Sequence, residues 1–178
     1  MRKQILPSQQ SGFTLVELLV VLSIAAIIVS IAAPSFMNII ANNRVTAASN
    51  ELVVALNLGK NEAVRSGQRT RLCKSQNGNQ CDNSANWKDG WLLFQDNDDN
   101  GSVNGAERII RVHSAPHASL DFEYPSGNSV VFRPDGRILI NANSHFCFRN
   151  SYNDDKSKAV VITMVGRIRT EDRNYDCV

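Results

Sequence analysis

The chain has 178 residues, of which 43% are hydrophobic and 20% are charged. The formal net charge of +2 is too near neutral to indicate a polyanion partner, so any nucleic-acid site has to be local. The part of the chain after the first 67 residues, roughly 110 residues, suffices for one domain with its own core but not for two.

The N-terminal part of the chain contains one long apolar run. Between Phe13 and Phe36 the only ionisable side chain is Glu17. About 20 apolar residues can cross a bilayer, so we expect a membrane-spanning helix. The short segment before the run carries Arg2 and Lys3, a positive flank of the kind retained in the cytoplasm. Because a carboxylate is unfavourable in lipid, Glu17 is expected to have a partner and a function.

The residues after Phe36 repeat apolar side chains at helical spacing as far as Arg65. One stripe of this amphipathic helix is expected to pack on a globular domain, and Ser66-Gly67 is expected to end it. Pro34 is expected to kink the helix where it leaves the membrane. The expected stripe consists of Val45, Ala48, Leu52, Ala55, Leu56, Gly59 and Ala63.

After Gly67 the sequence changes to short β-like segments separated by Gly, Asn, Asp or Pro. Strands are expected over residues 68–74, 90–95, 108–113, 129–133, 137–140, 145–149 and 159–165. One long helix followed by short strands predicts an α+β fold, with a long kinked N-terminal helix packed on an antiparallel β-sheet domain.

The sequence Gly12-Phe13-Thr14-Leu15-Val16-Glu17 resembles the processing motif of type IV pilins and type II secretion pseudopilins. The resemblance implies cleavage after Gly12 by a prepilin peptidase, N-methylation of Phe13 and a mature chain of 166 residues. It also implies that Glu17 pairs with a freed Phe13 amine when subunits stack in a fibre. The alternative is an ordinary signal anchor whose glutamate lies near the membrane interface.

Further segments, 61–65, 90–96, 131–137 and 165–169, resemble the FimT/GspH-type minor pilins. The resemblance implies the type IV pilin fold. The implied domains are a leader (1–12), a transmembrane and assembly helix (13–36), an amphipathic helix half (37–67) and a β-rich globular domain with a C-terminal basic edge (68–178).

Four cysteines lie in the part of the chain that would be translocated. An even number of cysteines in an oxidising compartment indicates two disulfides, for which three connectivities are open. We favour Cys73–Cys81, which closes a Gly/Asn-rich loop, and Cys147–Cys177, which would link the C-terminal tail to a strand. A zinc site is the competing interpretation, but neither a CxxC spacing nor paired histidines support it.

Residues 96–107 match the calcium-loop pattern D-x-[DN]-x-[DN]-G-x5-E at every fixed position. Calcium would take oxygens from Asp96, Asp98, Asn100, the Ser102 carbonyl and Glu107. A strand precedes the loop where a calcium-binding helix-loop-helix has a helix, and Asp, Asn and Gly are also common turn formers. We therefore favour an acidic hairpin loop and expect no resident metal or cofactor, with calcium as the alternative.

The segment Gly166-Arg167-Ile168-Arg169 is the candidate DNA-binding motif. On a strand, Arg167 and Arg169 share one face about 6.6 Å apart, while phosphates on one DNA strand advance about 3.4 Å each. Gly166 would let the backbone approach a phosphate. The basic surface could be extended by Arg149, Lys156, Lys158 and Arg173. The alternative is a solvated strand face with ion pairs to Glu171 or Asp172, because residues 149–178 hold six basic and five acidic side chains.

The Gly-Arg-x-Arg motif resembles one associated with DNA capture in FimT-type pilins of naturally competent bacteria. We therefore expect a minor pilin that enters the type IV pilus and binds extracellular DNA non-specifically for natural transformation. The implied partners are other pilins, prepilin peptidase, the inner membrane before assembly, and DNA. The implied location is the inner membrane with a periplasmic domain, and then the pilus.

Two other functions remain open from the sequence. One is a priming subunit for pilus biogenesis that binds no ligand, and the other is a type II secretion pseudopilin. Catalysis is not expected, because the sequence contains neither a nucleophile elbow nor a phosphate-cradling glycine loop.

Overall fold

The computed structural model describes residues 12–105, 107–115, 120–139, 144–150 and 153–172, without the side chains of 153–156. The chain divides into two compact units, Met1–Met37 and Asn38–Val178. Helix α1, Leu15–Ser66, contributes its first part to one unit and its remainder to the other.

Helix α1 begins at a side-chain cap and ends at a glycine. The hydroxyl of Thr14 accepts a hydrogen bond of 3.2 Å from the backbone N–H of Glu17, which satisfies one donor of the first turn. At the other end, Gly67 has a φ of 68° and donates its N–H to the Ala63 carbonyl at 3.1 Å, as in a left-handed C-terminal cap. The 52-residue helix continues through Pro34, so the predicted extent of the helix is confirmed.

The predicted apolar stripe on the second part of α1 faces the core. Ala48 is half-buried and packs on the core cluster, and the other predicted positions are buried. The stripe also contains Glu62, whose carboxylate accepts from Arg65 at 2.8 Å and pairs with Arg108. These guanidinium partners offset the unfavourable burial of a charge. The buried residues are Ala41, Val45, Ser49, Leu52, Ala55, Leu56, Gly59, Glu62 and Ala63.

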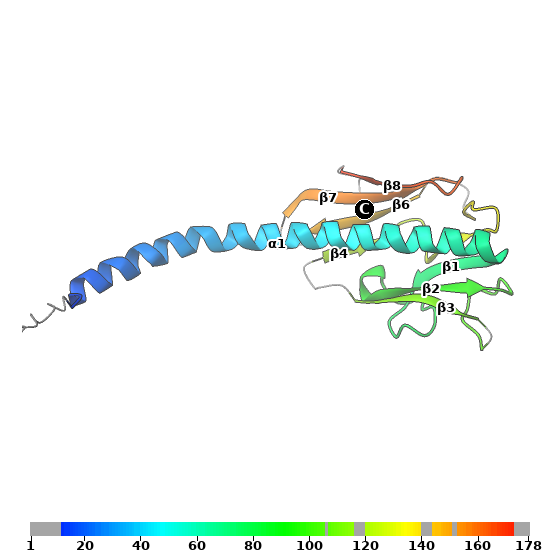
Figure 1. The fold of residues 1–178 in the computed structure, drawn as a ribbon, viewed down its shortest axis with the longest axis horizontal. Helices are drawn as coiled ribbons and strands as arrows, with labels where there is room; N and C mark the ends of the chain where they lie inside the picture. Colours follow the sequence, from blue (N-terminus) through cyan, green and yellow to red (C-terminus); the bar gives the residue numbers. More distant parts are fainter. Residues whose placement is uncertain (1–11, 106, 116–119, 140–143, 151–152, 173–178) are drawn as a thin grey trace, which may run out of the picture. The chain divides into compact units, whose positions relative to one another are not determined.

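The described part of the second unit contains two four-stranded antiparallel sheets beside its part of α1 (Figure 1). One sheet has the order β3-β2-β1-β5, with β1 (Arg69–Lys74), β2 (Gly90–Asp96), β3 (Ile109–Ser114) and β5 (Ser129–Phe132). The other has the order β4-β6-β7-β8, with β4 (Leu120–Glu123), β6 (Ser144–Asn150), β7 (Asn153–Ile162) and β8 (Ile168–Glu171). A short 3-10 helix, η1 (Trp87–Asp89), precedes β2. The second part of α1 runs along both sheets (Figure 1).

The prediction of a strand over residues 137–140 is wrong for residues 137–139, the part of this range that the structure describes. Only Ile138 forms an isolated bridge, to Phe132. The chain makes a tight turn just before it, in which the Gly136 N–H donates to the Arg133 carbonyl at 2.8 Å. The turn brings the chain back beside β5 for a single bridging residue.

The other strand differences concern β4, β7 and β8. Strand β7 begins at Asn153 and not at residue 159, and β8 was considered as a strand only for the arginine motif. The four residues of β4 were not predicted as a strand, because their apolar alternation is too short to stand out. The strand expected over residues 159–165 ends at Ile162, where a hairpin turn leads into β8. In this hairpin the Thr163 N–H donates to the Arg167 carbonyl at 3.0 Å.

An aromatic cluster joins η1 to the second sheet inside the core. The Trp87 ring meets Phe146 edge-on at a centroid distance of 5.1 Å and Tyr124 at 5.6 Å. Phe122 stacks on Phe148 at 4.5 Å. Such pairs contribute about 0.5–1.5 kcal/mol each beyond their buried area, so this cluster fixes how the loop before β2 packs against β4 and β6.

The predicted disulfide Cys73–Cys81 is confirmed, and it closes the loop that follows β1. Cys147 in β6 is also disulfide-bonded. Its predicted partner, Cys177, lies outside the described residues, so the pairing Cys147–Cys177 stays a prediction.

A close backbone contact joins the turn after β5 to the β7–β8 hairpin. Gly166 is buried with a φ of 73°, and a Cβ on this residue would lie 2.0 Å from the carbonyl oxygen of Gly136. The Gly166 carbonyl accepts a hydrogen bond of 2.8 Å from Lys60 of α1. The Ile138 N–H donates to the Met164 carbonyl at 3.2 Å. Three separate segments thus meet at a point where only glycine fits.

Replacing Gly166 with alanine is expected to destabilise the fold more than the same change at Gly67. Both residues have a positive φ, which costs about 1–2 kcal/mol for a side chain, but the Cβ at Gly67 would meet nothing within 4 Å. The clash at Gly136 adds about 1–3 kcal/mol for Gly166→Ala. Urea unfolding of both variants measures the difference. Equal losses of unfolding free energy would contradict the close contact.

Candidate functional site

The described part of the N-terminal unit, residues 12–37, is apolar and almost entirely exposed. Leu15, Val16 and Ile31 are 74%, 68% and 71% exposed. By its length and apolar composition, α1 is able to cross a membrane. None of the residues in its most apolar stretch is buried in the structure. An apolar helical surface of this kind is stable only in lipid or against other apolar surfaces.

Glu17 lies in the first turn of α1, three residues after the Thr14 cap. The spacing Thr-x-x-Glu is that of a capping box, in which the acid returns a hydrogen bond to the cap residue. Only the first half of the box is present, the bond from the Glu17 N–H to the Thr14 hydroxyl. Among the described residues, the Glu17 carboxylate has neither a hydrogen bond nor an ion pair. The carboxylate is therefore available to a group outside this chain.

The candidate DNA-binding arginines lie at the β7–β8 hairpin. Arg167 pairs with Thr163 at the base of the hairpin turn, and Arg169 lies on β8, which is an edge strand of its sheet. Both side chains are exposed. Between them, Ile168 packs against the core. The alternation places both arginines on the side that faces away from the core, with Arg169 on β8 and Arg167 directly before it.

Several of the candidate basic residues have acidic partners. The Arg169 guanidinium donates to Glu171 at 2.6 Å, and Lys158 donates to Asp172 at 2.7 Å. A longer pair of 3.8 Å joins Arg149 to Glu123. These contacts correspond to the solvated, ion-paired strand face that the sequence left open as an alternative. The Lys156 side chain and Arg173 lie outside the described residues.

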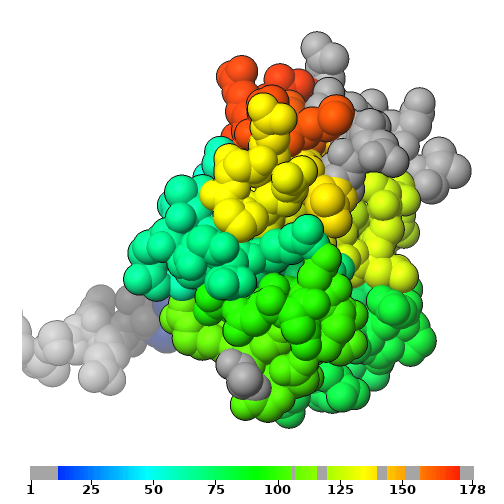
Figure 2. All heavy atoms as spheres, turned by 90° about the vertical axis from the view of Figure 1, so that its right-hand side faces the viewer, coloured from blue at the N-terminus to red at the C-terminus, as the bar shows by residue number. Residues whose placement is uncertain are grey.

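Other basic residues, not singled out from the sequence, surround the glycine contact at the end of the hairpin. Arg133 and Arg137 flank the turn that contains Gly136, and both are exposed. Figure 2 shows the segment that carries them next to the β7–β8 hairpin. We call Lys60, Arg133, Arg137, Arg167 and Arg169 the basic surface.

The basic surface carries a local excess of positive charge. Two acidic residues lie within it, Asp135, 3.8 Å from Arg133, and Glu171. Five basic and two acidic side chains leave a net charge of +3. Gly166 is buried against Gly136, so its backbone has a structural role and does not present an open surface to a phosphate.

The candidate calcium residues meet in the loop between β2 and β3. Ligand atoms of Asp96, Asp98 and Glu107 all lie within 4.8 Å of one another. Asn100 hydrogen-bonds to Asp98 at 2.8 Å through its side-chain amide. The structure thus brings together the acidic side chains that the sequence pattern selected.

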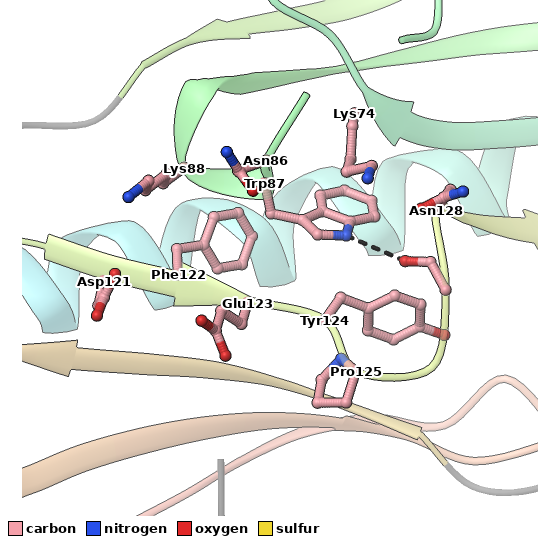
Figure 3. A pocket seen from close by; sticks show the side chains of 11 residues that line it. Lys74, Asn86, Trp87, Lys88, Asp121, Phe122, Glu123, Tyr124, Pro125 and Asn128 are labelled. Carbon is pink, nitrogen blue, oxygen red and sulfur yellow. Dashed lines mark hydrogen bonds between the residues drawn. The ribbon is translucent and has the colours of Figure 1, made fainter. Parts of the chain in front are cut away.

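A separate pocket of about 340 Å³ lies between η1 and β4 (Figure 3). The Trp87 ring forms part of its lining and donates its Nε1–H to the Gly127 carbonyl at 3.2 Å. Its charged lining residues are two basic and two acidic side chains, Lys74, Lys88, Asp121 and Glu123. The balanced charge gives the pocket no preference for an anion such as phosphate.

The surroundings of Tyr124 and Asp82 shift the pKa values of these two side chains. Burial raises the pKa of the Tyr124 hydroxyl, although a hydrogen bond of 2.9 Å to Ser144 acts in the opposite direction. Hydrogen bonds from the hydroxyl and the backbone N–H of Ser84 lower the pKa of Asp82. Neither shift moves a group towards neutral pH, where general acid–base catalysis operates.

Comparisons with known protein families agree with the exposed apolar helix and the β-rich domain described above. The family described as "Type II transport protein GspH" matches residues 48–166, and the prokaryotic N-terminal methylation motif matches residues 7–33. No sequence among the curated proteins compared matches the chain.

Two solved structures share the fold. The type IV minor pilin FimU of Pseudomonas aeruginosa is 20% identical with a TM-score of 0.59, over 72% of this chain and 89% of that chain. The minor pseudopilin EpsH from the type 2 secretion system of Vibrio cholerae is 12% identical with a TM-score of 0.53, over 74% and 99%. Because the GspH match covers more than half of the chain and a methylation motif precedes it, this protein belongs to the GspH family of minor pilins and pseudopilins.

Proposed function

We propose that this minor pilin enters a type IV pilus through its N-terminal helix and binds extracellular DNA through its basic surface. Family membership makes it a structural subunit and not an enzyme, with other pilins as partners and prepilin peptidase as its processing enzyme. Assembly and DNA binding rest on different parts of the chain, and each has its own test.

The assembly proposal rests on the exposed apolar helix and the unpaired carboxylate. Residues 1–12 are removed as the leader, residues 13–36 anchor the chain in the inner membrane, and residues 37–178 lie in the periplasm before assembly. Cleavage after Gly12 frees an amine on Phe13. In a fibre, the Glu17 carboxylate of one subunit pairs with this amine on another, because an acid in apolar surroundings requires a charged partner.

The DNA proposal rests on the exposed arginines that flank the Gly136–Gly166 contact. Guanidinium groups bind phosphate oxygens through paired N–H donors, so a cluster of them binds the DNA backbone without selecting a sequence. Arg167 and Arg137 have no ion pair among the described residues, and they are the main candidates. Arg169 has to exchange Glu171 for a phosphate, which reduces its contribution.

One observation favours a function without a ligand. Three of the four candidate bases whose side chains are described have an acidic partner, because Arg169 pairs with Glu171, Lys158 with Asp172 and Arg149 with Glu123. A face neutralised in this way also suits a priming subunit whose β domain only contacts neighbouring pilins. Both functions use the same N-terminal helix, so a measurement of DNA binding is needed to distinguish the DNA-binding subunit from the priming subunit.

Processing is expected to leave a mature chain of 166 residues that begins with N-methylated Phe13. Mass spectrometry of the protein purified from membranes checks this. A chain that is uncut, or trimmed beyond Ala33, would contradict both the leader and the assembly helix.

Glu17→Gln is expected to abolish incorporation into pili while leaving the protein in the membrane. The amide keeps the shape of the side chain but cannot neutralise an amine, and breaking such a buried pair costs about 3–5 kcal/mol. We expect the subunit in sheared pili to fall at least tenfold, measured by immunoblot against the membrane fraction. Glu51→Gln, the same change on α1 within the second unit, is the control and should assemble normally. Normal incorporation of Glu17→Gln would contradict the pairing.

Replacing Arg167 and Arg169 with alanine is expected to weaken DNA binding by the full chain in detergent micelles. About three phosphate contacts give a slope near −3 for log affinity against log salt. The double variant should lose about one to two units of this slope, because Arg167 contributes a full contact and the paired Arg169 only part of one. Affinity at low salt should fall at least tenfold for every DNA sequence tested. Fluorescence anisotropy with labelled duplexes measures both quantities.

The matched control removes two positive charges elsewhere, through Lys74→Ala with Lys88→Ala at the pocket. Equal losses in the two double variants would show that net charge, and not the basic surface, attracts DNA. If the wild-type protein does not bind DNA at low salt, the proposal is wrong and the ligand-free priming function is favoured.

A further inference from the structure

The loop between β2 and β3 holds a group of carboxylates at the spacing that a single cation requires. Oxygen ligands lie about 2.3–2.6 Å from a calcium ion, so two ligands of one ion are at most about 5 Å apart. The three ligand atoms of Asp96, Asp98 and Glu107 lie within 4.8 Å of one another. These residues occupy positions 1, 3 and 12 of the calcium-loop pattern.

A second observation is independent of this spacing. The Asp96 side chain is fully buried, and its Oδ1 atom has no hydrogen-bond partner among the residues that the structure describes. Its other oxygen, Oδ2, accepts from the Arg71 guanidinium at 2.7 Å. A buried carboxylate oxygen without a partner is destabilising by about 1–3 kcal/mol or more, so natural proteins rarely retain one unless an ion, a water or a function uses it.

The ion pairs around the loop separate ligand positions from non-ligand positions. Asp99, at position 4, points towards Arg69 and Arg71 and pairs with both. In the part of the chain that the structure describes, neither Asp98 nor Glu107 has a basic partner. Four carboxylates face two guanidinium groups, which leaves a charge of −2 on the loop. A divalent cation would neutralise this charge.

The backbone of the loop is compatible with the same ligand. Gly101, at position 6, has a φ of 77°, which supplies the sharp turn that the pattern reserves for glycine. The hydrogen bonds that Asp98 and Glu107 accept within the loop leave lone pairs open, because a carboxylate has about four acceptor sites. The strand that precedes the loop in place of a helix positions Asp96 through its pairing with β1, where Asp96 lies opposite Arg69.

We propose that residues 96–107 bind one calcium ion, with the side chains of Asp96, Asp98, Asn100 and Glu107 and the Ser102 carbonyl as ligands. This differs from the metal-free turn that the sequence context favoured, and it does not depend on DNA binding. Outside the cell, a site with a dissociation constant near 10⁻⁴–10⁻³ M is sufficient, as in other extracellular calcium modules. Magnesium prefers a smaller octahedral site and retains its waters, so we expect the loop to select calcium.

The test is calcium titration of the full chain in detergent micelles by isothermal calorimetry, after removal of metals with EDTA. One saturable site per chain is expected, together with a melting temperature about 5–10 °C higher at a calcium concentration 100 times the dissociation constant. Magnesium is expected to bind at least tenfold more weakly. Absence of a saturable calcium site, or equal affinity for magnesium, would overturn the proposal.

Matched variants separate ligation from general charge. Asp98→Asn and Glu107→Gln each remove a ligand charge and are expected to weaken calcium binding at least tenfold. Asp99→Asn removes the same charge from the same loop at a non-ligand position, and its affinity should change less than threefold. The melting temperatures in EDTA show that each variant folds. If Asp99→Asn weakens binding as much as the two ligand variants, the loop attracts cations by charge alone and the proposed site is wrong.

Discussion

The stripe of small and aliphatic side chains on the second part of α1 packs against both sheets, and the rest of the domain depends on this contact. Leu52 and Leu56 are fully buried among residues of both sheets. Burial of a leucine stabilises a fold by about 1.5–3 kcal/mol, so a few such residues equal a large share of a domain's net stability. Without the helix, each sheet would expose one apolar face to water.

This arrangement leaves the candidate functional groups on hairpins at the borders of the sheets. The basic surface lies where the turn after β5 meets the β7–β8 hairpin, and Lys60 of α1 joins the two through the Gly166 carbonyl. The acidic loop joins β2 to β3, and Arg71 of the neighbouring strand β1 holds it through Asp96. In both places a rigid sheet positions a loop that can vary in sequence without disturbing the core.

Features with a regular period could be predicted from the sequence, whereas features assembled by tertiary packing could not. The 3.6-residue repeat indicated the buried side of α1, and short runs of apolar, aromatic or β-branched residues between turn formers indicated β1, β2 and β5. Strand β4 was missed because, unlike the equally short β5, it contains no β-branched residue. Arg137 was not assigned to the basic surface, because it joins Arg167 only through the contact between Gly136 and Gly166, which are 30 positions apart. No local pattern reports such a contact.

At the acidic loop, the sequence context and the structure favour different interpretations. Its pattern was complete, but the preceding strand argued against a metal, since the familiar form of this loop lies between helices. A strand fixes Asp96 by backbone pairing and removes it from solvent, and its Oδ1 has no hydrogen-bond partner in the described part of the chain. The near-neutral net charge also conceals a loop of −2 and a surface of +3. Since charges in physiological salt are screened over about 8 Å, these local groups, and not the total of +2, decide which ions and phosphates the protein attracts.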